Sequence, residues 1–275
     1  MVIADAHLHI WDATAHYYPW LSDRPVAFRY GDYSALPRRY LVEDYRRDAS
    51  GWDVARGVYI EAEWDPRDPV GEMDFIAEVR RAHHFPTVAV AQAWLDREDC
   101  AAVLESHARR SFVRGVRQKP QPGQMDDERW RAGFARLAPL GLHFELQAPW
   151  QQLGEAARLA RDFPDITIVL NHTGLPHDER LGAWRDALAP LAESPNVAVK
   201  VSGLGTVSQK REVVLAAIEM FGTRRAMLAS NYPVDRLCHA FDAIWRTFDD
   251  ITRGLADAER RALFHDNAMR IYRME

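Results

Sequence analysis

The residues best suited to chemistry are histidines that close apolar runs of the chain. His7 and His9 fall at the end of the run 2–10, and side chains two residues apart on a β-strand point to one face. Two neutral imidazoles on one face form half of a divalent metal site. A second apolar run, 166–171, leads into His172 before the chain breaks at Gly and Pro. The alternative for all three is a structural histidine held by hydrogen bonds.

Other polar side chains close further apolar runs. Glu61 and Glu63 share one face at the end of the run 57–62, either as site carboxylates or as a solvated strand end. Arg117 is suited to bidentate binding of a substrate carboxylate, with a salt bridge at the rim as the alternative. Gln147, at the end of a later run, offers a polar contact for a ligand.

Lys200 lies inside the β-branched run 197–202. A buried ammonium is costly unless it is paired, so Lys200 needs a carboxylate partner or a substrate anion. Asn231 ends the last apolar run, and Asp235 follows on the next loop. These positions predict either structural pairing or catalysis for Lys200.

Elements that position these residues follow from a repeated pattern. Short β-rich runs alternate with amphipathic helical stretches, which predicts βαβ units and a parallel sheet. The eight predicted strands cover residues 2–10, 57–62, 87–93, 113–118, 143–147, 166–171, 197–202 and 226–230. Eight strands in 275 residues favour an α/β fold of the (β/α)₈ TIM-barrel type over an open sheet, and no Gly-x-Gly-x-x-Gly follows the first strand. In such a barrel the chemistry lies at the carboxyl ends of the strands.

The longest gap between predicted strands, residues 10–57, contains Trp11, Tyr17, Tyr18 and Trp20. A loop so long and so aromatic predicts a lid or pocket wall, with Trp11 as a substrate contact. No composition shift marks a boundary, so residues 1–275 are predicted to form one domain.

Composition excludes several classes of protein. Hydrophobic residues make up 47% of the chain, which excludes disorder, and a net charge of −5 argues against nucleic-acid binding. Cys100 and Cys238 are too few and too far apart for a disulfide framework. The chain shows neither a signal peptide nor an apolar run of membrane-spanning length. We therefore expect a soluble, cytoplasmic monomer or homodimer whose partner is a small-molecule substrate.

Four motifs together resemble the amidohydrolase superfamily. They are His-x-His-x-Trp-Asp after the first predicted strand, Asn-His-Thr-Gly after the sixth, Lys-Val-Ser-Gly after the seventh and Ser-Asn-Tyr-Pro after the eighth. Within the superfamily, the chain is most similar to the branch of lactonases that act on sugar lactones and on 2-pyrone-4,6-dicarboxylate. The resemblance implies a (β/α)₈ barrel that hydrolyses an ester, lactone or amide-like bond with an activated water.

Metal-dependent members of the superfamily bind their ions through the His pair, two further histidines and an Asp after the eighth strand. By this resemblance His7, His9 and His172 match, whereas Gln147 and Asn231 stand where a His and the Asp are expected. Amide oxygens are weaker ligands than imidazole or carboxylate. We therefore expect that no cofactor is required, or that a divalent metal such as zinc or manganese binds weakly, with doubtful occupancy at His7 and His9.

In the lactonase branch the eighth-strand Asp is the general base, a role that Asn231 cannot take because an amide does not accept a proton. Our hypothesis is that His172 is the base and that Asn231 orients water or substrate. Asp235, Glu61 or Glu63 could take over instead, or the chain could hydrolyse poorly.

A lactonase also needs donors for the oxyanion and groups that hold the substrate. His7, His9 and Lys200 are candidates for the first role. The substrate-binding candidates are Arg117, Gln147, Glu61 and Trp11. Two alternatives remain open besides a lactonase: a metal-dependent non-oxidative decarboxylase of the same superfamily, and a ligand-binding barrel that has lost its base.

Overall fold

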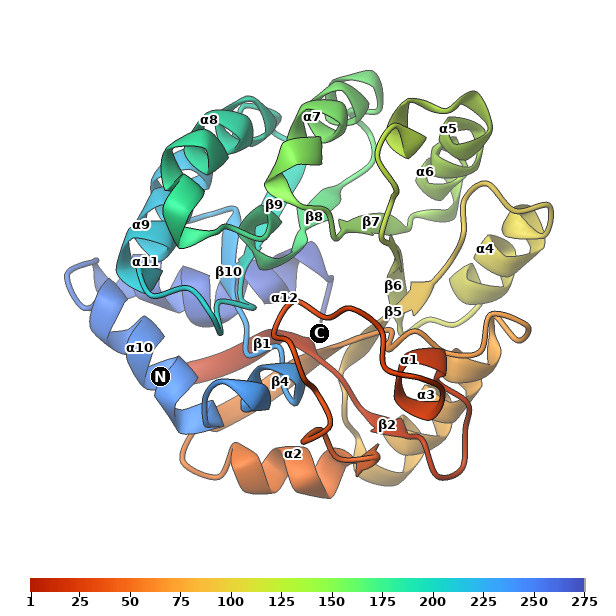
Figure 1. Ribbon diagram of the computed structural model, residues 1–275, viewed down its shortest axis with the longest axis horizontal. Helices are drawn as coiled ribbons and strands as arrows, with labels where there is room; N and C mark the ends of the chain where they lie inside the picture. Colours follow the sequence, from red (N-terminus) through yellow and green to blue (C-terminus); the bar gives the residue numbers. More distant parts are fainter. Residues whose placement is uncertain (275) are drawn as a thin grey trace.

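The structure, a computed structural model that describes residues 1–274, is a ring of eight parallel strands surrounded by helices (Figure 1). Neighbouring strands in the ring follow one another along the chain. The strands are β1 (Val2–Leu8), β4 (Asp53–Ile60), β5 (Val88–Gln92), β6 (Val113–Gln118), β7 (His143–Leu146), β8 (Ile168–Leu170), β9 (Val197–Val201) and β10 (Ala226–Leu228). The predicted (β/α)₈ barrel is thus confirmed.

Helices connect the strands and cover the outside of the ring. The α-helices are α1 (Pro19–Ser22), α2 (Val42–Asp48), α3 (Gly71–His83), α4 (Cys100–Ala108), α5 (Glu128–Ala135), α6 (Leu137–Leu140), α7 (Leu153–Asp162), α8 (Leu181–Ala192), α9 (Lys210–Phe221), α10 (Phe241–Thr252), α11 (Asp257–Arg261) and α12 (Asn267–Ile271). Short helical turns are η1 (Gln124–Asp126), η2 (Trp150–Gln152), η3 (Asn171–Gly174), η4 (Asp178–Arg180), η5 (Val234–Leu237) and η6 (Ala262–Asp266). No helix among the described residues is both long and apolar enough to span a membrane.

All eight predicted strands are present, but several end earlier than the apolar runs suggest. β1 ends at Leu8 and β4 at Ile60, so His9 and Glu61 lie one residue beyond their strands. Apolar runs continue past the strand ends because the first loop residues are buried as well. The site residues therefore occupy the irregular segments where the barrel opens.

Small and β-branched side chains fill the barrel interior. The buried cluster inside the ring contains Ala4, Ala6, Val58, Val90, Val169, Ala198 and Ala229. Ala268 and Tyr272, from α12 and just after it, belong to the same cluster. The end of the chain therefore closes the barrel at the amino ends of the strands.

Hydrogen bonds of Asp5 fasten the seam between the first and last strands. Its fully buried carboxylate accepts from the Ser230 backbone N–H at 2.9 Å, from Ser230 Oγ at 2.5 Å and from Tyr45 Oη at 2.7 Å. Backbone bonds continue the seam: Asn231 N donates to His7 O, and His9 N donates to Tyr232 O. The two segments that carry the candidate residues His7, His9 and Asn231 are thus held side by side.

The long segment after β1 contains a two-stranded sheet, β2 (Trp11–Asp12) with β3 (Arg39–Tyr40), and the helices α1 and α2. Its aromatic rings pack on one another: Trp20 stacks on Phe28 with ring centroids 5.9 Å apart. Trp11 and Trp20 meet edge to face at 5.6 Å. The segment forms a wall over the carboxyl ends of the strands, as predicted.

Candidate active site

His7, His9 and His172 meet at the mouth of the barrel. The Nε2 atoms of His7 and His9 lie 3.2 Å apart, and the rings of His7 and His172 have centroids 4.6 Å apart. His9 and His172 line a cavity of about 50 Å³, and His7, which is fully buried, lies next to both of them. The structure therefore brings together the three histidines selected from the sequence.

All three imidazoles are neutral near pH 7. Burial, followed by the positive charge of Lys200, holds the pKa of His7 well below its usual value. Burial and the charge of Arg117 lower the pKa of His9 to about 3. Burial, followed by the charges of Arg29 and Arg117, holds the pKa of His172 well below its usual value. Neutral imidazoles can accept protons or bind metals.

Hydrogen bonds fix the proton positions of the histidine pair. His9 Nδ1 lies 2.8 Å from the carbonyl oxygen of Ile60, so it must carry the proton and donate. The lone pair of His9 Nε2 then accepts from the Nε2–H of His7. His7 Nδ1 is buried without a hydrogen-bond partner. The only N–H of His7 is thereby used, so in this arrangement neither ring offers a donor to a substrate oxyanion.

His172 follows β8 in a strained turn. Its φ of 54° lies in the left-handed region, as does that of Thr173 at 51°. Such strain persists only where the surroundings hold it, and it is common at functional sites. His172 Nδ1 hydrogen-bonds Ser202 Oγ at 2.9 Å. When Nδ1–H donates to Ser202, the lone pair lies on Nε2, the other ring nitrogen.

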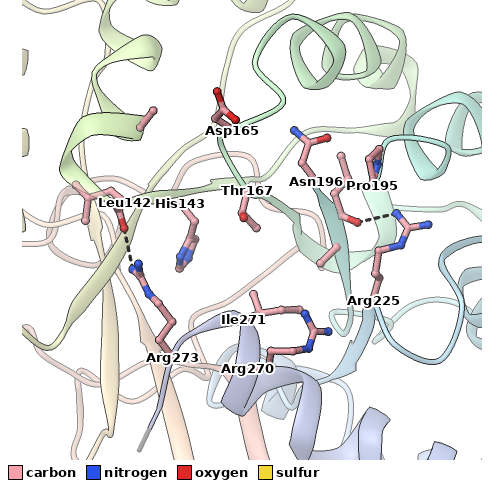
Figure 2. Close-up of a pocket in the computed structure, with 14 residues that line it drawn as sticks. Leu142, His143, Asp165, Thr167, Pro195, Asn196, Arg225, Arg270, Ile271 and Arg273 are labelled. Atoms are coloured by element: carbon pink, nitrogen blue, oxygen red, sulfur yellow. Dashed lines mark hydrogen bonds between the residues drawn. The ribbon is translucent and has the colours of Figure 1, made fainter.

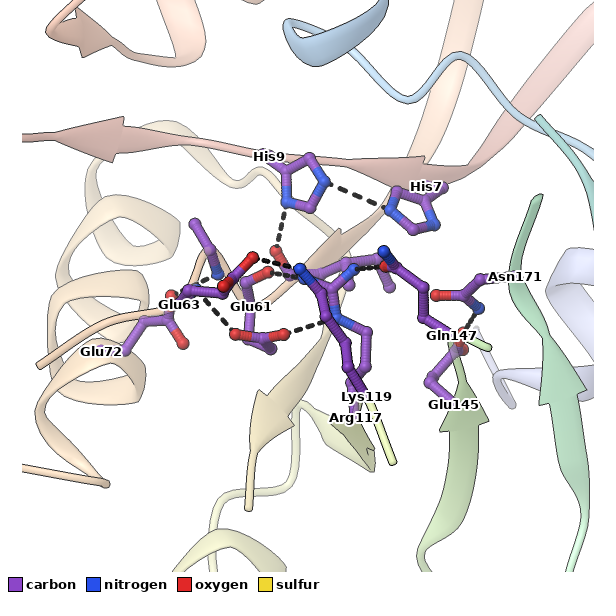
Figure 3. Close-up of polar contacts among 12 residues, drawn as sticks. His7, His9, Glu61, Glu63, Glu72, Arg117, Lys119, Glu145, Gln147 and Asn171 are labelled. Atoms are coloured by element: carbon purple, nitrogen blue, oxygen red, sulfur yellow. Dashed lines mark hydrogen bonds and ion pairs between the residues drawn. The ribbon is translucent and has the colours of Figure 1, made fainter. Parts of the chain in front are cut away.

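An ion pair at the mouth holds Arg117 (Figure 3). Its Nε donates to Glu61 Oε1 at 2.5 Å and its Nη2 to the Glu61 carbonyl oxygen at 2.6 Å. Its Nη1 donates to Gln147 Oε1 at 2.9 Å. Arg117 and Gln147 line the cavity, whereas the Glu61 carboxylate is engaged by Arg117 and the Glu63 N–H. This arrangement orients Gln147 so that its amide N–H groups point away from Arg117.

Glu63 and Lys119 form a second ion pair on the cavity wall. Burial acts to raise the pKa of Glu63, but the charge and hydrogen bond of Lys119, together with the charge of Arg117, hold that pKa below its usual value. A carboxylate with a lowered pKa is a weak base. Glu63 is therefore poorly suited to activate water.

Lys200 lies below the mouth, in the barrel interior. Its Nζ is 2.8 Å from Glu145 Oε2, and both side chains are fully buried. Tyr272 Oη donates to Glu145 Oε1 at 2.5 Å, and Asn171 Nδ2 donates to Oε2. Lys200 does not line the cavity, so its predicted catalytic role stays a prediction, while the carboxylate partner it requires is Glu145.

Asn231 lines the cavity, and a hydrogen bond to a buried carboxylate holds its side chain in place. Its Nδ2 donates to Asp235 Oδ1 at 2.6 Å, and Tyr30 Oη donates to the same oxygen at 2.7 Å. Burial raises the pKa of Asp235 to about 6, although both hydrogen bonds oppose the shift. Asp235 lines a neighbouring cavity rather than the one that contains the histidines. Its position suits it to orienting Asn231.

Several residues of the site were not selected from the sequence: Arg29, Ser202, Glu145 and Tyr30. Arg29 and Tyr30 lie in an irregular loop without periodicity. The sequence pattern therefore could not predict that their side chains reach the mouth of the barrel. Ser202 was part of a predicted strand, but its contact with His172 joins residues thirty positions apart. Glu145 could have been found, because a carboxylate in a buried strand is the partner that Lys200 needs.

Donor groups at the mouth do not fit a divalent metal. Within residues 1–274 no group of three or more His, Cys, Asp or Glu side chains is placed to hold one. For both Nε2 atoms of the pair to bind a metal, His7 would carry its proton on Nδ1, where no acceptor lies. Arg29, Arg117 and Lys119 also place positive charge on the cavity wall.

A larger cavity, of about 350 Å³, lies at the opposite face, where the strands begin (Figure 2). Arg225, Arg270 and Arg273 line it, and each donates to backbone carbonyl oxygens. In (β/α)₈ barrels this face serves stability rather than chemistry.

Comparison with known proteins places this architecture in a family. A family model described as Amidohydrolase matches residues 4–274. The chain belongs to the amidohydrolase family, and it is a hydrolase. The uncharacterized protein y4mH of Sinorhizobium fredii is 40% identical over 100% of this chain and 99% of its own. L-fucono-1,5-lactonase of Burkholderia multivorans is 26% identical over 98% of this chain and 95% of its own.

Solved structures share the fold. An amidohydrolase from Burkholderia multivorans with bound zinc superposes with a TM-score of 0.86 at 24% identity, and 100% of each chain is covered. A putative 2-pyrone-4,6-dicarboxylic acid hydrolase from Pseudomonas putida gives 0.75 at 22%, covering 99% of this chain and 98% of its own. A 5-carboxyvanillate decarboxylase from Novosphingobium aromaticivorans, complexed with manganese, gives 0.73 at 12%, covering 99% and 96%. Divalent metals thus occur among proteins of this fold.

Proposed function

We propose that this amidohydrolase opens a lactone by adding water, with His172 Nε2 as the general base and without a resident metal. The observation that carries the proposal is His172 itself, a neutral imidazole on the cavity wall with its Nδ1 held by Ser202. Two L-fucono-1,5-lactonases, each 26% identical over 98% of this chain, support the choice of a lactone.

The other candidate bases are less suited to this role. Glu61 is engaged by Arg117, and Asp235 lies outside the cavity. Glu63 is paired with Lys119. The lone pair of His9 Nε2 accepts the hydrogen bond of His7, whereas His172 Nε2 carries a free lone pair when Nδ1 is protonated. His172 thus replaces the carboxylate that Asn231 cannot supply.

In the proposed reaction, water transfers a proton to His172 Nε2 as its oxygen bonds to the lactone carbonyl carbon. Negative charge develops on the carbonyl oxygen, and Arg117 and Gln147, which line the cavity, are the candidate donors to it. The ring C–O bond then breaks, and His172 returns the proton to the departing oxygen. The product is a hydroxy acid, and Asn231 is placed to orient the water or the substrate.

A turnover assay of His172→Asn with metal-stripped protein tests this proposal. The substrates are L-fucono-1,5-lactone and 2-pyrone-4,6-dicarboxylate. We expect kcat to fall by about 10²–10⁴-fold because the general base is lost. His177→Asn, an exposed histidine on the following loop, is the matched control and should leave turnover unchanged.

Unchanged turnover in a folded His172→Asn protein would contradict the role of His172. Turnover of the unmodified protein only after zinc or manganese is added would contradict the metal-free reaction. It would favour the metal-dependent decarboxylase or hydrolase alternatives. Tight ligand binding without any turnover would favour a binding barrel.

A further inference from the structure

Arg29 reaches the candidate active site from the aromatic segment that covers it. It lies between α1 and β3 and lines the same cavity as His9 and His172. Its Nη2 donates to the carbonyl oxygen of Gly203 at 2.5 Å. Its guanidinium carbon lies 4.8 Å from the centre of the Tyr30 ring. These two contacts fix the side chain in place.

The other terminal nitrogen of Arg29 is left without a partner. Nη1 is buried and has no hydrogen-bond acceptor, and no carboxylate within residues 1–274 forms an ion pair with Arg29. The other cations on this wall differ, because Arg117 is paired with Glu61 and Lys119 with Glu63. A buried N–H of a charged group is costly to leave unpaired. The guanidinium of Arg29 therefore has no direct ion-pair partner on this wall, although its charge also acts on Asp235 and opposes the rise in the pKa of that carboxyl.

This charge lies beside the proposed base. A Cβ atom added to Gly203 would lie 2.6 Å from His172 Nδ1 and 2.9 Å from Arg29 Nη1, so both nitrogens approach one point. The φ of Gly203 is +64°, a conformation that other residues rarely adopt. Glycine at this position allows the guanidinium and the imidazole to occupy the same corner of the cavity.

We propose that Arg29 receives a carboxylate of the substrate, so that this chain acts on lactones that carry a carboxylate in preference to neutral sugar lactones. A carboxylate is the planar, bidentate acceptor that suits a guanidinium. It would supply the acceptor missing at Nη1 and an ion-pair partner for Arg29. The inference rests on the proposed function and names its substrate class.

Binding to a protein that cannot turn substrate over tests the inference directly. In the His172→Asn background, we expect calorimetry to show saturable binding of 2-pyrone-4,6-dicarboxylate. Arg29→Gln should weaken that binding by about 10-fold or more, since a charge-assisted hydrogen bond is lost. Arg29→Lys should give an intermediate affinity, because lysine keeps the positive charge but lacks the planar guanidinium that binds a carboxylate through two hydrogen bonds. Arg24→Gln, an exposed arginine of the same segment, is the matched control.

Three results would overturn the inference. They are an absence of dicarboxylate binding, an affinity that Arg29→Gln leaves unchanged, and an equal loss of affinity for neutral L-fucono-1,5-lactone. The last result would identify Arg29 as a group that acts on the lactone itself. Failure of the proposed function is distinct: dicarboxylate binding that depends on Arg29, together with no dependence of turnover on His172, would contradict only the general base.

Discussion

The barrel interior and the barrel mouth differ in whether their buried charged side chains are paired. In the interior, Lys200 and Glu145 face one another, and Tyr272 and Asn171 add hydrogen bonds to the carboxylate. At the mouth, Arg29 lines the cavity, its Nη1 has no hydrogen-bond partner, and it forms no ion pair with a carboxylate among residues 1–274. Each charge of a buried pair needs its partner to offset the cost of burial, whereas a charge without an ion-pair partner at a cavity is suited to a ligand.

The pKa values of the buried groups also differ between the interior and the mouth. Burial alone would raise the pKa of Glu145, but the charge of Lys200 and the hydrogen bond with His143 lower it to about 2. Burial lowers the pKa of Lys200 to about 8, and Glu145 opposes that shift. Both groups therefore keep their charges near pH 7. At the mouth, the three imidazoles are neutral and can exchange protons.

The largest expected effect tests the interior pair. Glu145→Gln leaves the Lys200 ammonium buried without a counter-charge and should lower the free energy of unfolding by about 3–5 kcal/mol. Urea unfolding measures the change. Glu145→Gln with Lys200→Met should recover part of the loss, because it removes both charges.

The control for this prediction is an exposed pair. Glu219→Gln removes the partner of Arg185 on the surface, where 72% of the Glu219 side chain is accessible, and should cost less than about 1 kcal/mol. If Glu145→Gln cost no more than Glu219→Gln, the interior pair would not stabilise the fold.

A smaller effect, on kcat, is expected when the hydrogen bond between the neutral side chains of Ser202 and His172 is removed. Ser202→Ala removes the partner of His172 Nδ1. Such a bond contributes about 0.5–1.5 kcal/mol, so kcat should fall by up to about tenfold with little change in KM. Steady-state kinetics on a carboxylated lactone would measure it, with the exposed Ser50→Ala as control. A change in KM alone would place Ser202 in substrate binding instead.

The smallest expected effect is a shift in pH dependence. The charge of Arg29 helps to hold the pKa of His172 down, so Arg29→Gln should raise that pKa. A base is lost when it takes up a proton, so the acid limb of kcat/KM should move to higher pH, by about one unit. Arg24→Gln should leave the limb in place. A limb that stays fixed or moves to lower pH would show that Arg29 does not act on His172.

Strand positions could be predicted well from sequence because parallel strands inside a barrel are apolar on both faces. The ends were less certain, since buried loop residues extend the apolar runs. The strand-end rule brought His7, His9 and His172 together, and the alternation of strands and helices implied their common face.

Pairing between distant residues could not be predicted from one sequence. The aromatic segment was expected to form a wall, but nothing in its composition showed that Arg29 rather than Arg24 faces the cavity. Arg117 was expected to bind a substrate carboxylate or to form a salt bridge at the rim, and the structure pairs it with Glu61 at the mouth, a partner that the sequence did not identify. Each of these outcomes depends on the meeting of segments far apart in the chain.

The hydrogen bonds of Asp5 have a consequence for how the protein is made. Asp5 and its partner Ser230 are separated by 225 positions, and the same seam aligns His7 with Asn231. A ribosome must therefore release most of the chain before the first strand can find its neighbour, and such non-local contacts form slowly. Until that meeting takes place, the nascent chain has neither a closed barrel nor an assembled candidate active site.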